Sequence, residues 1–293
     1  MCGIGGLIDY ANDTHQYQPV AAAMRRTLAP RGPDAEGEFC SADALLVHRR
    51  LIVIDPAGGA QPMYSPDGNT ILIYNGELYN TPELRQTLTA HGHVFRGHSD
   101  TEVLLHAFLE WGTDAFSRLN GIFAFAIWQQ AERRLILCRD RLGVKPLFYA
   151  HTADGLAFGS TIDTVLCHPA VQPEVDEDGL RALLLLGPAR PPAYGIFRQI
   201  RSLLPGHYAV LTPEAYADHI YWQLEAHEHP DDLETTIAHT HELRRRRAPA
   251  CLRCAAGLFS LRRTGFLHPF HADRTALRRT RRIAAHLVSG LSG

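Results

Sequence analysis

The chain lacks any apolar run of the roughly 18–20 residues that a membrane-spanning helix requires. Its N-terminus also lacks the basic-then-apolar layout of a secretory signal peptide, so we expect a cytoplasmic protein with no membrane partner. The six cysteines are mostly scattered along the 293 residues, which favours free thiols over a disulfide framework. Lysine is almost missing, since Lys145 is the only one. The composition that remains, 45% apolar and 20% charged, is typical of a folded globular protein.

Acidic residues are nearly absent from the C-terminal part of the chain. Residues 244–293 hold twelve arginines and one acid, Asp273, whereas residues 1–243 hold 17 basic and 30 acidic residues. The overall net charge of −2 therefore conceals a strongly basic tail behind an acidic main part. The two parts do not resemble a single globular design.

The first 165 residues or so read as strands with two clear helices between them. Thr81-Pro82-Glu83 predicts a helix start with Thr81 as N-cap, and Gly92 predicts its end. Ser99-Asp100-Thr101-Glu102 fits a capping box before a second helix. Short β-branched or apolar runs bounded by turn residues predict strands at 44–55, 69–80, 121–128, 134–140, 146–150 and 155–160. Several antiparallel strands with two helices indicate a layered α+β domain.

A cysteine follows the initiator methionine in the opening sequence MCGIGGLIDY. If Met1 is removed, Cys2 carries a thiol and a free α-amine on one residue. The α-amine can accept the thiol proton near neutral pH, and the resulting thiolate is a nucleophile. Alternatively, Cys2 is a small residue that packs passively.

Polar residues mark four other stretches where such a nucleophile would need help. RGPD (31–34) is a tight turn that carries an arginine. Arg50 lies in HRRLIVID, Asn75-Gly76 ends a strand in YNGELYN, and Asp100 opens a helix in GHSDTE. Each also has an ordinary explanation. Arg50 could be a surface residue, Asn75-Gly76 a plain turn, and Asp100 a complement to its helix dipole. RDRLGVKPLFY, with Asp140 and Lys145, reads better as a structural loop than as catalytic machinery.

The motifs MCGI, RGPD, RLxIxD, NGExYN, SDTE, GxFAFAxW and RDRLGxKPLFY occur in this order along the chain. In this order they resemble the class II (N-terminal-nucleophile) glutamine amidotransferase domain of the glutamine-hydrolysing asparagine synthetases. The resemblance covers roughly residues 1–240. It implies a cytoplasmic ligase family that makes asparagine from aspartate, with glutamine as nitrogen donor.

The resemblance also implies site residues. Cys2 would attack the side-chain amide carbon of glutamine, and Asn75 and Gly76 would stabilise the oxyanion. Arg50 would bind the glutamine α-carboxylate and Asp100 the α-ammonium, assisted by Leu51, Val53 and Glu77. This half-reaction needs no cofactor and no metal.

The expected fold is a four-layer α/β/β/α sandwich with two antiparallel sheets, of the N-terminal-nucleophile hydrolase type. We expect this amidotransferase domain over residues 1–205 and the start of an incomplete synthetase domain over 206–243. Residues 244–293 form the Arg-rich tail, which we expect to be non-native or disordered.

The sequence departs from the family after the first domain. Full-length members bind ATP and Mg²⁺ through a loop of the form SGGxDS, and no such motif occurs here. We therefore expect a synthetase domain lost by truncation or by a frame shift, and only the glutaminase half-reaction. The tail could instead be a basic arm for an anionic partner. It could also be a zinc site, since Cys251-x2-Cys254 precedes His268-x2-His271.

Two other functions stay open at this stage. The chain could be an inactive relict whose basic tail binds an anionic partner, although nucleic acid is not favoured. It could also be a glutaminase subunit that passes ammonia to a separate synthetase partner. A homodimer is equally compatible with the sequence.

Overall fold

Two antiparallel sheets, each of six strands, form the centre of the fold. The computed structural model describes residues 1–52, 55, 58–186, 193–226 and 228–243. The first sheet has the order β10-β8-β9-β1-β3-β2 and the second the order β12-β11-β7-β6-β5-β4. The first sheet consists of β1 (Gly3–Asp9), β2 (Ala35–Cys40), β3 (Ala44–Arg50), β8 (Phe148–His151), β9 (Gly155–Gly159) and β10 (Ile200–Ser202). The second consists of β4 (Met63–Tyr64), β5 (Thr70–Leu78), β6 (Gly121–Gln129), β7 (Arg134–Arg139), β11 (His207–Leu211) and β12 (Tyr216–Ile220).

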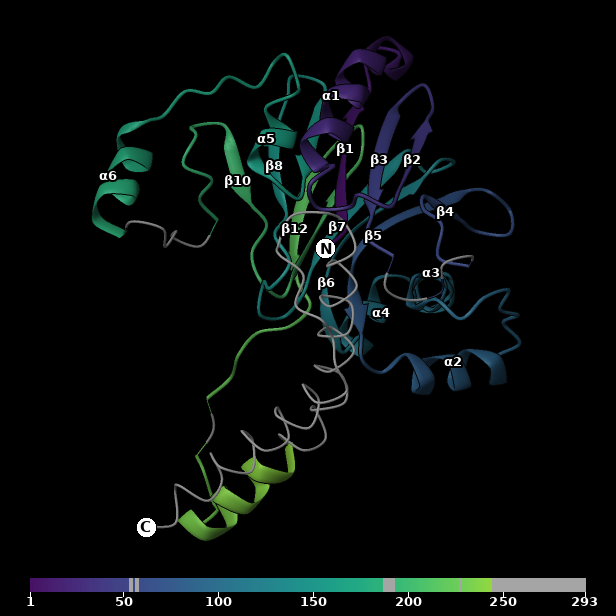
Figure 1. Ribbon diagram of the computed structural model, residues 1–293, viewed down its shortest axis with the longest axis vertical. Helices are drawn as coiled ribbons and strands as arrows, with labels where there is room; N and C mark the ends of the chain where they lie inside the picture. The colour runs from purple at the N-terminus through teal and green to yellow at the C-terminus, as the bar shows by residue number, and fades with distance from the viewer. Residues whose placement is uncertain (53–54, 56–57, 187–192, 227, 244–293) are drawn as a thin grey trace, which may run out of the picture. The chain divides into compact units, whose positions relative to one another are not determined.

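Helices cover the outer faces of both sheets (Figure 1). One apolar cluster packs α1 (Gln18–Leu28) and α5 (Ile162–Val165) on the first sheet. A second packs α2 (Thr81–Ala90), α3 (Asp100–Trp111) and α4 (Ala115–Arg118) on the second sheet. A third fills the space between the sheets. The predicted four-layer α/β/β/α sandwich is therefore confirmed. Short 3-10 helices, η1 (Thr14–Tyr17) and η2 (Gly112–Asp114), and α6 (Glu177–Leu186) complete the fold.

The two predicted helix starts differ in how they are capped. Ser99 accepts the N–H of Glu102, as a capping box requires. The Glu102 carboxylate, however, accepts N–H groups of the preceding loop, from Arg96 and Gly97, and so holds the approach to α3. At α2 the N-cap residue is Asn80 rather than the predicted Thr81. Gly92 follows α2 with φ +93°, the left-handed conformation that glycine tolerates best.

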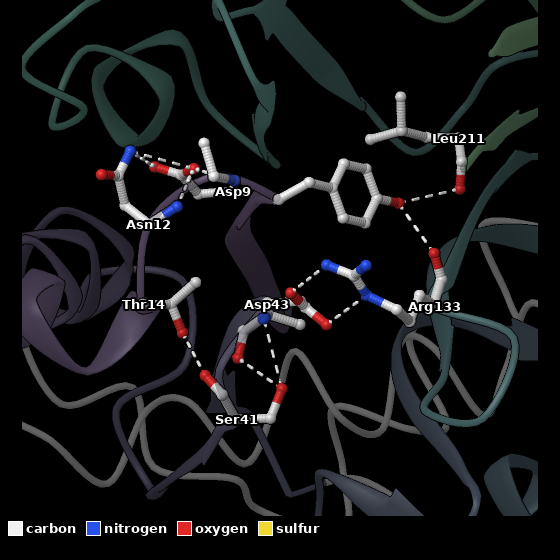
Figure 2. A network of polar contacts seen from close by, with 10 residues as sticks. Asp9, Asn12, Thr14, Ser41, Asp43, Arg133 and Leu211 are labelled. Atoms are coloured by element: carbon white, nitrogen blue, oxygen red, sulfur yellow. Dashed lines mark hydrogen bonds and ion pairs between the residues drawn. The ribbon is translucent and has the colours of Figure 1, made fainter. Parts of the chain in front are cut away.

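Polar side chains join the two sheets at the end of β1 that lies away from Cys2 (Figure 2). Arg133, from the turn between β6 and β7, forms a bidentate ion pair with Asp43, from the turn between β2 and β3, at 2.5 and 2.7 Å. The Tyr10 hydroxyl donates to the backbone carbonyls of Arg133 and Leu211 at 2.9 and 3.2 Å. Asp9 accepts the N–H groups that begin the next turn. These contacts tie the C-terminal end of β1, and with it the first sheet, to the second sheet.

The loop after β7 is organised by a buried carboxylate. Asp140 accepts the backbone N–H groups of Leu142 and Val144 on one oxygen, and those of Phe123 and Lys145 on the other. These four distances lie between 2.9 and 3.2 Å. The geometry agrees with the prediction that this loop is structural.

The compact first unit extends to Pro230, beyond the predicted domain end at residue 205. The reason is that β11 pairs with β7 along residues 208–211, and β12 pairs with β11. The second unit begins at Asp231, and its described part contains a helix over 233–243. The predicted tail and the candidate zinc ligands, Cys251 to His271, lie outside the described residues.

Candidate active site

The predicted nucleophile, Cys2, is half-buried immediately before β1. Its Sγ accepts the backbone N–H of Leu51 at 3.4 Å and lies 3.6 Å from the Leu51 carbonyl oxygen. Burial raises the pKa of the Cys2 thiol, against the opposing effects of the Leu51 contact and of the charge on Arg50. The thiol therefore stays protonated near neutral pH unless a base accepts its proton.

Two basic side chains lie next to the first two residues of the chain. Arg31 Nε donates to the Cys2 carbonyl at 3.1 Å, and Lys145 Nζ lies 3.3 Å from the sulfur of Met1. Burial lowers the pKa of the α-amine of Met1, and the charges of Arg31 and Lys145 lower it further, while Asp34 opposes them. A lowered pKa increases the neutral fraction of an α-amine, which is the form that can accept a proton.

Arg50, at the end of β3, is 7% exposed and is held by the loop that follows. Its Nη2 donates to the Asp55 carbonyl at 2.7 Å. A Cβ at Gly59 would lie 2.2 Å from the same nitrogen, so a larger residue there would displace the guanidinium from this position. The Asp55 carboxylate accepts the His98 N–H at 2.7 Å, and this bond is the main reason that its pKa is lowered. Asp55 thus connects two segments, the loop that contacts Arg50 and the turn that precedes Asp100.

Asp100, in the first turn of α3, is buried beside β5. Its Oδ2 accepts the Tyr74 hydroxyl at 2.9 Å and the Leu78 N–H at 3.2 Å. Burial raises the pKa of Asp100, and the bond from Tyr74 opposes that effect. A cationic ligand at this carboxylate would remove the penalty of burying the charge.

Asn75 and Gly76 lie in β5 opposite Ala124 and Phe123 of β6. Asn75 is 1% exposed, yet its side-chain Nδ2 has no hydrogen-bond partner among the residues that the structure describes. At Gly76 a Cβ would lie 2.5 Å from the Ile122 carbonyl, so β6 leaves no room for a side chain. A buried amide donor without an acceptor is unusual and calls for an explanation.

The N–H of Gly76 points to the same side of β5 as the site. Backbone polar groups of a strand alternate in direction with period two. The N–H groups of Tyr74 and Leu78 both bond to side chains away from β6, those of Gln61 and Asp100. The N–H of Gly76, which lies between them, therefore faces away from β6 as well.

The structure thus groups most of the predicted site residues around the N-terminal end of β1. The charges of Arg50 and Asp100 both act on the Cys2 thiol, and Leu51 contacts it directly. Glu77 is half-buried in β5, next to Gly76. Val53 lies outside the described residues. The roles assigned to these residues stay predictions.

Several polar residues around this site were not predicted from the sequence. Tyr74 holds Asp100, Asp55 holds Arg50, and Gln61 accepts the Tyr74 N–H at 2.6 Å. His48 contacts the Tyr74 carbonyl from the opposite sheet. A sequence signal existed for His48, because it directly follows four apolar residues in the buried strand ALLVHRR.

Comparison with known proteins decides the family. The family described as "Glutamine amidotransferase domain" matches residues 1–222, about three quarters of the chain. The chain belongs to this family. The match ends after β12 and so agrees with the extent of the sandwich in the structure.

The relatives of this amidotransferase domain are longer proteins. It is 43% identical over 246 residues to "Asparagine synthetase [glutamine-hydrolyzing] 3" of Bacillus subtilis (strain 168). That match covers 83% of the chain and 40% of the relative. It is 32% identical over 250 residues to "Asparagine synthetase [glutamine-hydrolyzing] 2" of the same organism, covering 80% of the chain and 33% of the relative. The chain thus spans well under half the length of these relatives.

Solved structures support the fold. The glutamine phosphoribosylpyrophosphate amidotransferase of B. subtilis matches with a TM-score of 0.55 and 18% identity, over 76% of this chain and 50% of that one. A structure titled as the allosteric regulatory enzyme of purine biosynthesis matches with a TM-score of 0.56 and 19% identity, over the same shares. At these identities the likeness concerns the sandwich alone.

Within the described residues, no group of three or more His, Cys, Asp or Glu side chains is arranged to hold a metal ion. No helix in the same part of the chain is long and apolar enough to cross a bilayer.

Proposed function

We propose that this amidotransferase domain hydrolyses the side-chain amide of glutamine to glutamate and ammonia, with Cys2 as nucleophile. Removal of Met1 makes Cys2 the N-terminal residue. Its α-amine then takes the thiol proton, and the sulfur attacks the amide carbon. A C–S bond forms, and the carbonyl oxygen becomes an oxyanion.

The oxyanion lies between two donors, the Nδ2–H of Asn75 and the backbone N–H of Gly76. The α-ammonium returns its proton to the amide nitrogen, the C–N bond breaks, and ammonia leaves. Water then attacks the thioester through a second oxyanion, the C–S bond breaks, and glutamate and the free thiol are released. Arg50 and Asp100 bind the α-carboxylate and α-ammonium of the substrate, as their opposite charges allow.

The observation that carries this proposal is the unpartnered amide of Asn75. A buried donor without an acceptor costs about 1–3 kcal/mol, which a folded protein rarely retains without a use. Preorganised donors of this kind stabilise a charge that develops only during the reaction. The site therefore favours acyl transfer over simple binding.

The test compares the wild-type chain with Cys2→Ala. Intact mass shows whether Met1 is absent, and coupled detection of glutamate measures hydrolysis. We expect the wild type to lack Met1 and to release glutamate, and Cys2→Ala to fall to background. Glutamate release that survives in Cys2→Ala would rule out the proposed nucleophile. Removal of Met1 without any hydrolysis would favour an inactive relict.

We propose that the ammonia serves asparagine formation, the activity in the names of the relatives. That reaction also requires ATP and Mg²⁺, for which the SGGxDS loop is missing from this sequence. We expect the chain alone to form no asparagine from aspartate, ATP, Mg²⁺ and ammonium chloride. Asparagine in that assay would show that the chain performs both half-reactions.

A further inference from the structure

His48 lies in β3, and the chemistry proposed above does not use it. Its side chain is 1% exposed. It lies on the same face of β3 as Ala44 and Leu46, which belong to the apolar core between the two sheets. Arg50, two residues further on, lies on this face as well. A polar ring among apolar side chains is expected to make a specific hydrogen bond.

That hydrogen bond crosses from one sheet to the other. His48 Nε2 lies 3.2 Å from the carbonyl oxygen of Tyr74 in β5. A carbonyl oxygen only accepts, so Nε2 carries the proton and donates. The Tyr74 carbonyl and the Asn75 nitrogen belong to one planar peptide group. The bond therefore fixes the orientation of the peptide from which Asn75 begins.

We propose that His48 is a positioning residue for the oxyanion donors Asn75 and Gly76, acting through its hydrogen bond to the Tyr74 carbonyl. The inference rests on the proposed glutaminase function. Donors in such a site must be held within about 0.5 Å of their productive position. Because His48 and Arg50 share β3, the same bond also sets the spacing between the substrate carboxylate and the oxyanion.

The backbone of Tyr74 is held on both of its polar groups. Its N–H donates to Gln61 Oε1 at 2.6 Å, and its carbonyl accepts from His48. Both groups point away from β6, and no described strand pairs with them on that side. Two side chains thus make the hydrogen bonds next to Asn75 that a neighbouring strand would otherwise make. Without the His48 bond, the Gln61 bond would be the remaining hydrogen bond to the backbone of Tyr74 on this side of β5.

The imidazole acts as a neutral group. The pKa of His48 is lowered to about 3, mainly by burial and to a smaller extent by the charge of Arg50, while the Tyr74 bond acts in the opposite direction. Its Nδ1 is buried and has no hydrogen-bond partner among the described residues, so a proton on that nitrogen would find no acceptor there. His48 therefore supplies no proton at neutral pH, and its effect should not depend on pH there. This separates positioning from acid–base catalysis.

A pair of substitutions tests the proposal. The amide nitrogen of glutamine reaches about as far as Nε2 of histidine, whereas that of asparagine reaches only about as far as Nδ1. We expect His48→Asn to lower kcat for glutamine hydrolysis about 10- to 100-fold, with KM changed less than about threefold. We expect His48→Gln to restore kcat to within about fivefold of the wild type, since its donor can reach the Tyr74 carbonyl.

Two further measurements separate positioning from packing. Alkylation of Cys2 by iodoacetamide needs no oxyanion donor, so its rate should be the same in both variants. Nitrogen-15 NMR of histidine-labelled wild type should show His48 as the neutral Nε2–H tautomer at pH 6. The Nδ1–H tautomer would overturn the inference even if neither variant folds.

The outcomes for the two proposals are distinguishable. A wild type without Cys2-dependent hydrolysis would overturn the proposed function, and this inference with it. An active wild type in which both variants lose kcat equally, or in which KM rises at constant kcat, would overturn the inference alone.

Discussion

Two neighbouring segments, 74–78 and 139–145, both place polar groups inside the sandwich, and they differ in how those groups are satisfied. In 139–145 the Asp140 carboxylate accepts four backbone N–H groups. In 74–78 Asn75 is as deeply buried, but its amide nitrogen has no partner within the described part of the chain. In the first segment the backbone fills the acceptors of the Asp140 carboxylate, although the buried Nε of Arg141 has no partner among the described residues. In the second segment the unpartnered donor belongs to a residue that we propose to contact the substrate.

Arg139 strengthens the contrast. Its guanidinium donates to the carbonyls of Gly143, Lys145 and Leu203 and to the Ser202 hydroxyl, at 2.6–2.9 Å. The segment is thus rich in charged residues, and these bonds hold it to itself and to residues 202–203. Charge alone therefore does not mark a functional segment.

The largest effect is expected from Asp140→Ala, which leaves four N–H groups without their acceptor, two of them buried and two partly buried. The free energy of unfolding should fall by about 4 kcal/mol, since each buried group costs about 1–3 kcal/mol and each partly buried one less. Urea unfolding followed by tryptophan fluorescence measures it. The exposed Asp114→Ala is the control and should change stability little. A loss below about 1 kcal/mol for Asp140→Ala would show that this loop does not depend on the carboxylate.

Asn75→Ala should lower activity strongly and stability little, in contrast to Asp140→Ala, which should lower stability. Loss of one oxyanion donor should lower kcat about 10²- to 10³-fold, which is about 3–4 kcal/mol in the transition state. Stability should change little, because no intramolecular hydrogen bond of Nδ2 is lost. Glutamate release and thermal unfolding measure the two effects, with Asn12→Ala at the far end of β1 as control. A decrease in the free energy of unfolding as large as that of Asp140→Ala would contradict the proposed difference between the two segments.

The pH dependence of stability should report on His48. Its pKa is about 3 in the folded protein and about 6.5 when unfolded, so the unfolded chain binds the proton first as the pH falls. The stability that depends on neutral His48 is complete above pH 6.5 and is lost as the pH falls toward 3. The loss by pH 5 should be about 2 kcal/mol. His48→Gln should flatten this slope, because glutamine does not titrate. Equal slopes for wild type and His48→Gln would contradict the prediction.

The smallest effect is expected from Tyr74→Phe. Removing the hydroxyl takes one hydrogen bond from Asp100, worth about 1 kcal/mol, and should raise KM for glutamine roughly three- to tenfold. The effect on kcat should be smaller, because the proposed contact of Asp100 with the substrate α-ammonium lies away from the reacting carbon. Tyr64→Phe, at a half-exposed tyrosine, is the matched control. A fall in kcat at constant KM would assign Tyr74 to the reacting centre instead.

Local patterns in the sequence predicted much of the fold. Apolar periodicity and caps placed α2 and α3, and turn residues separated β6, β7, β8 and β9. The register between distant strands leaves no local trace, which is why β11 and β12 were assigned to another domain. Only their pairing with β7 shows that they complete the second sheet.

The candidate site was predicted from ordered motifs, not from any one residue. Cys2, Arg50, Asn75 and Asp100 each have an ordinary explanation, and their joint order suggested the chemistry. The supporting residues were missed for a physical reason. His48 and Tyr74 are separated by 26 positions in the sequence, and their bond joins a side chain to a carbonyl on another sheet. Such contacts depend on how the sheets stack, which the sequence pattern does not specify.

The pairing of β11 with β7 has a consequence for handling the protein. β11 covers one side of β7, and the short, polar β12 then forms the outer border of the sheet. A chain cut after residue 205 would expose the N–H and C=O groups of β7 along an apolar strand. Uncovered strands of this kind recruit strands from other molecules. Such a fragment should self-associate and precipitate, whereas a fragment that ends near residue 230 should stay dispersed.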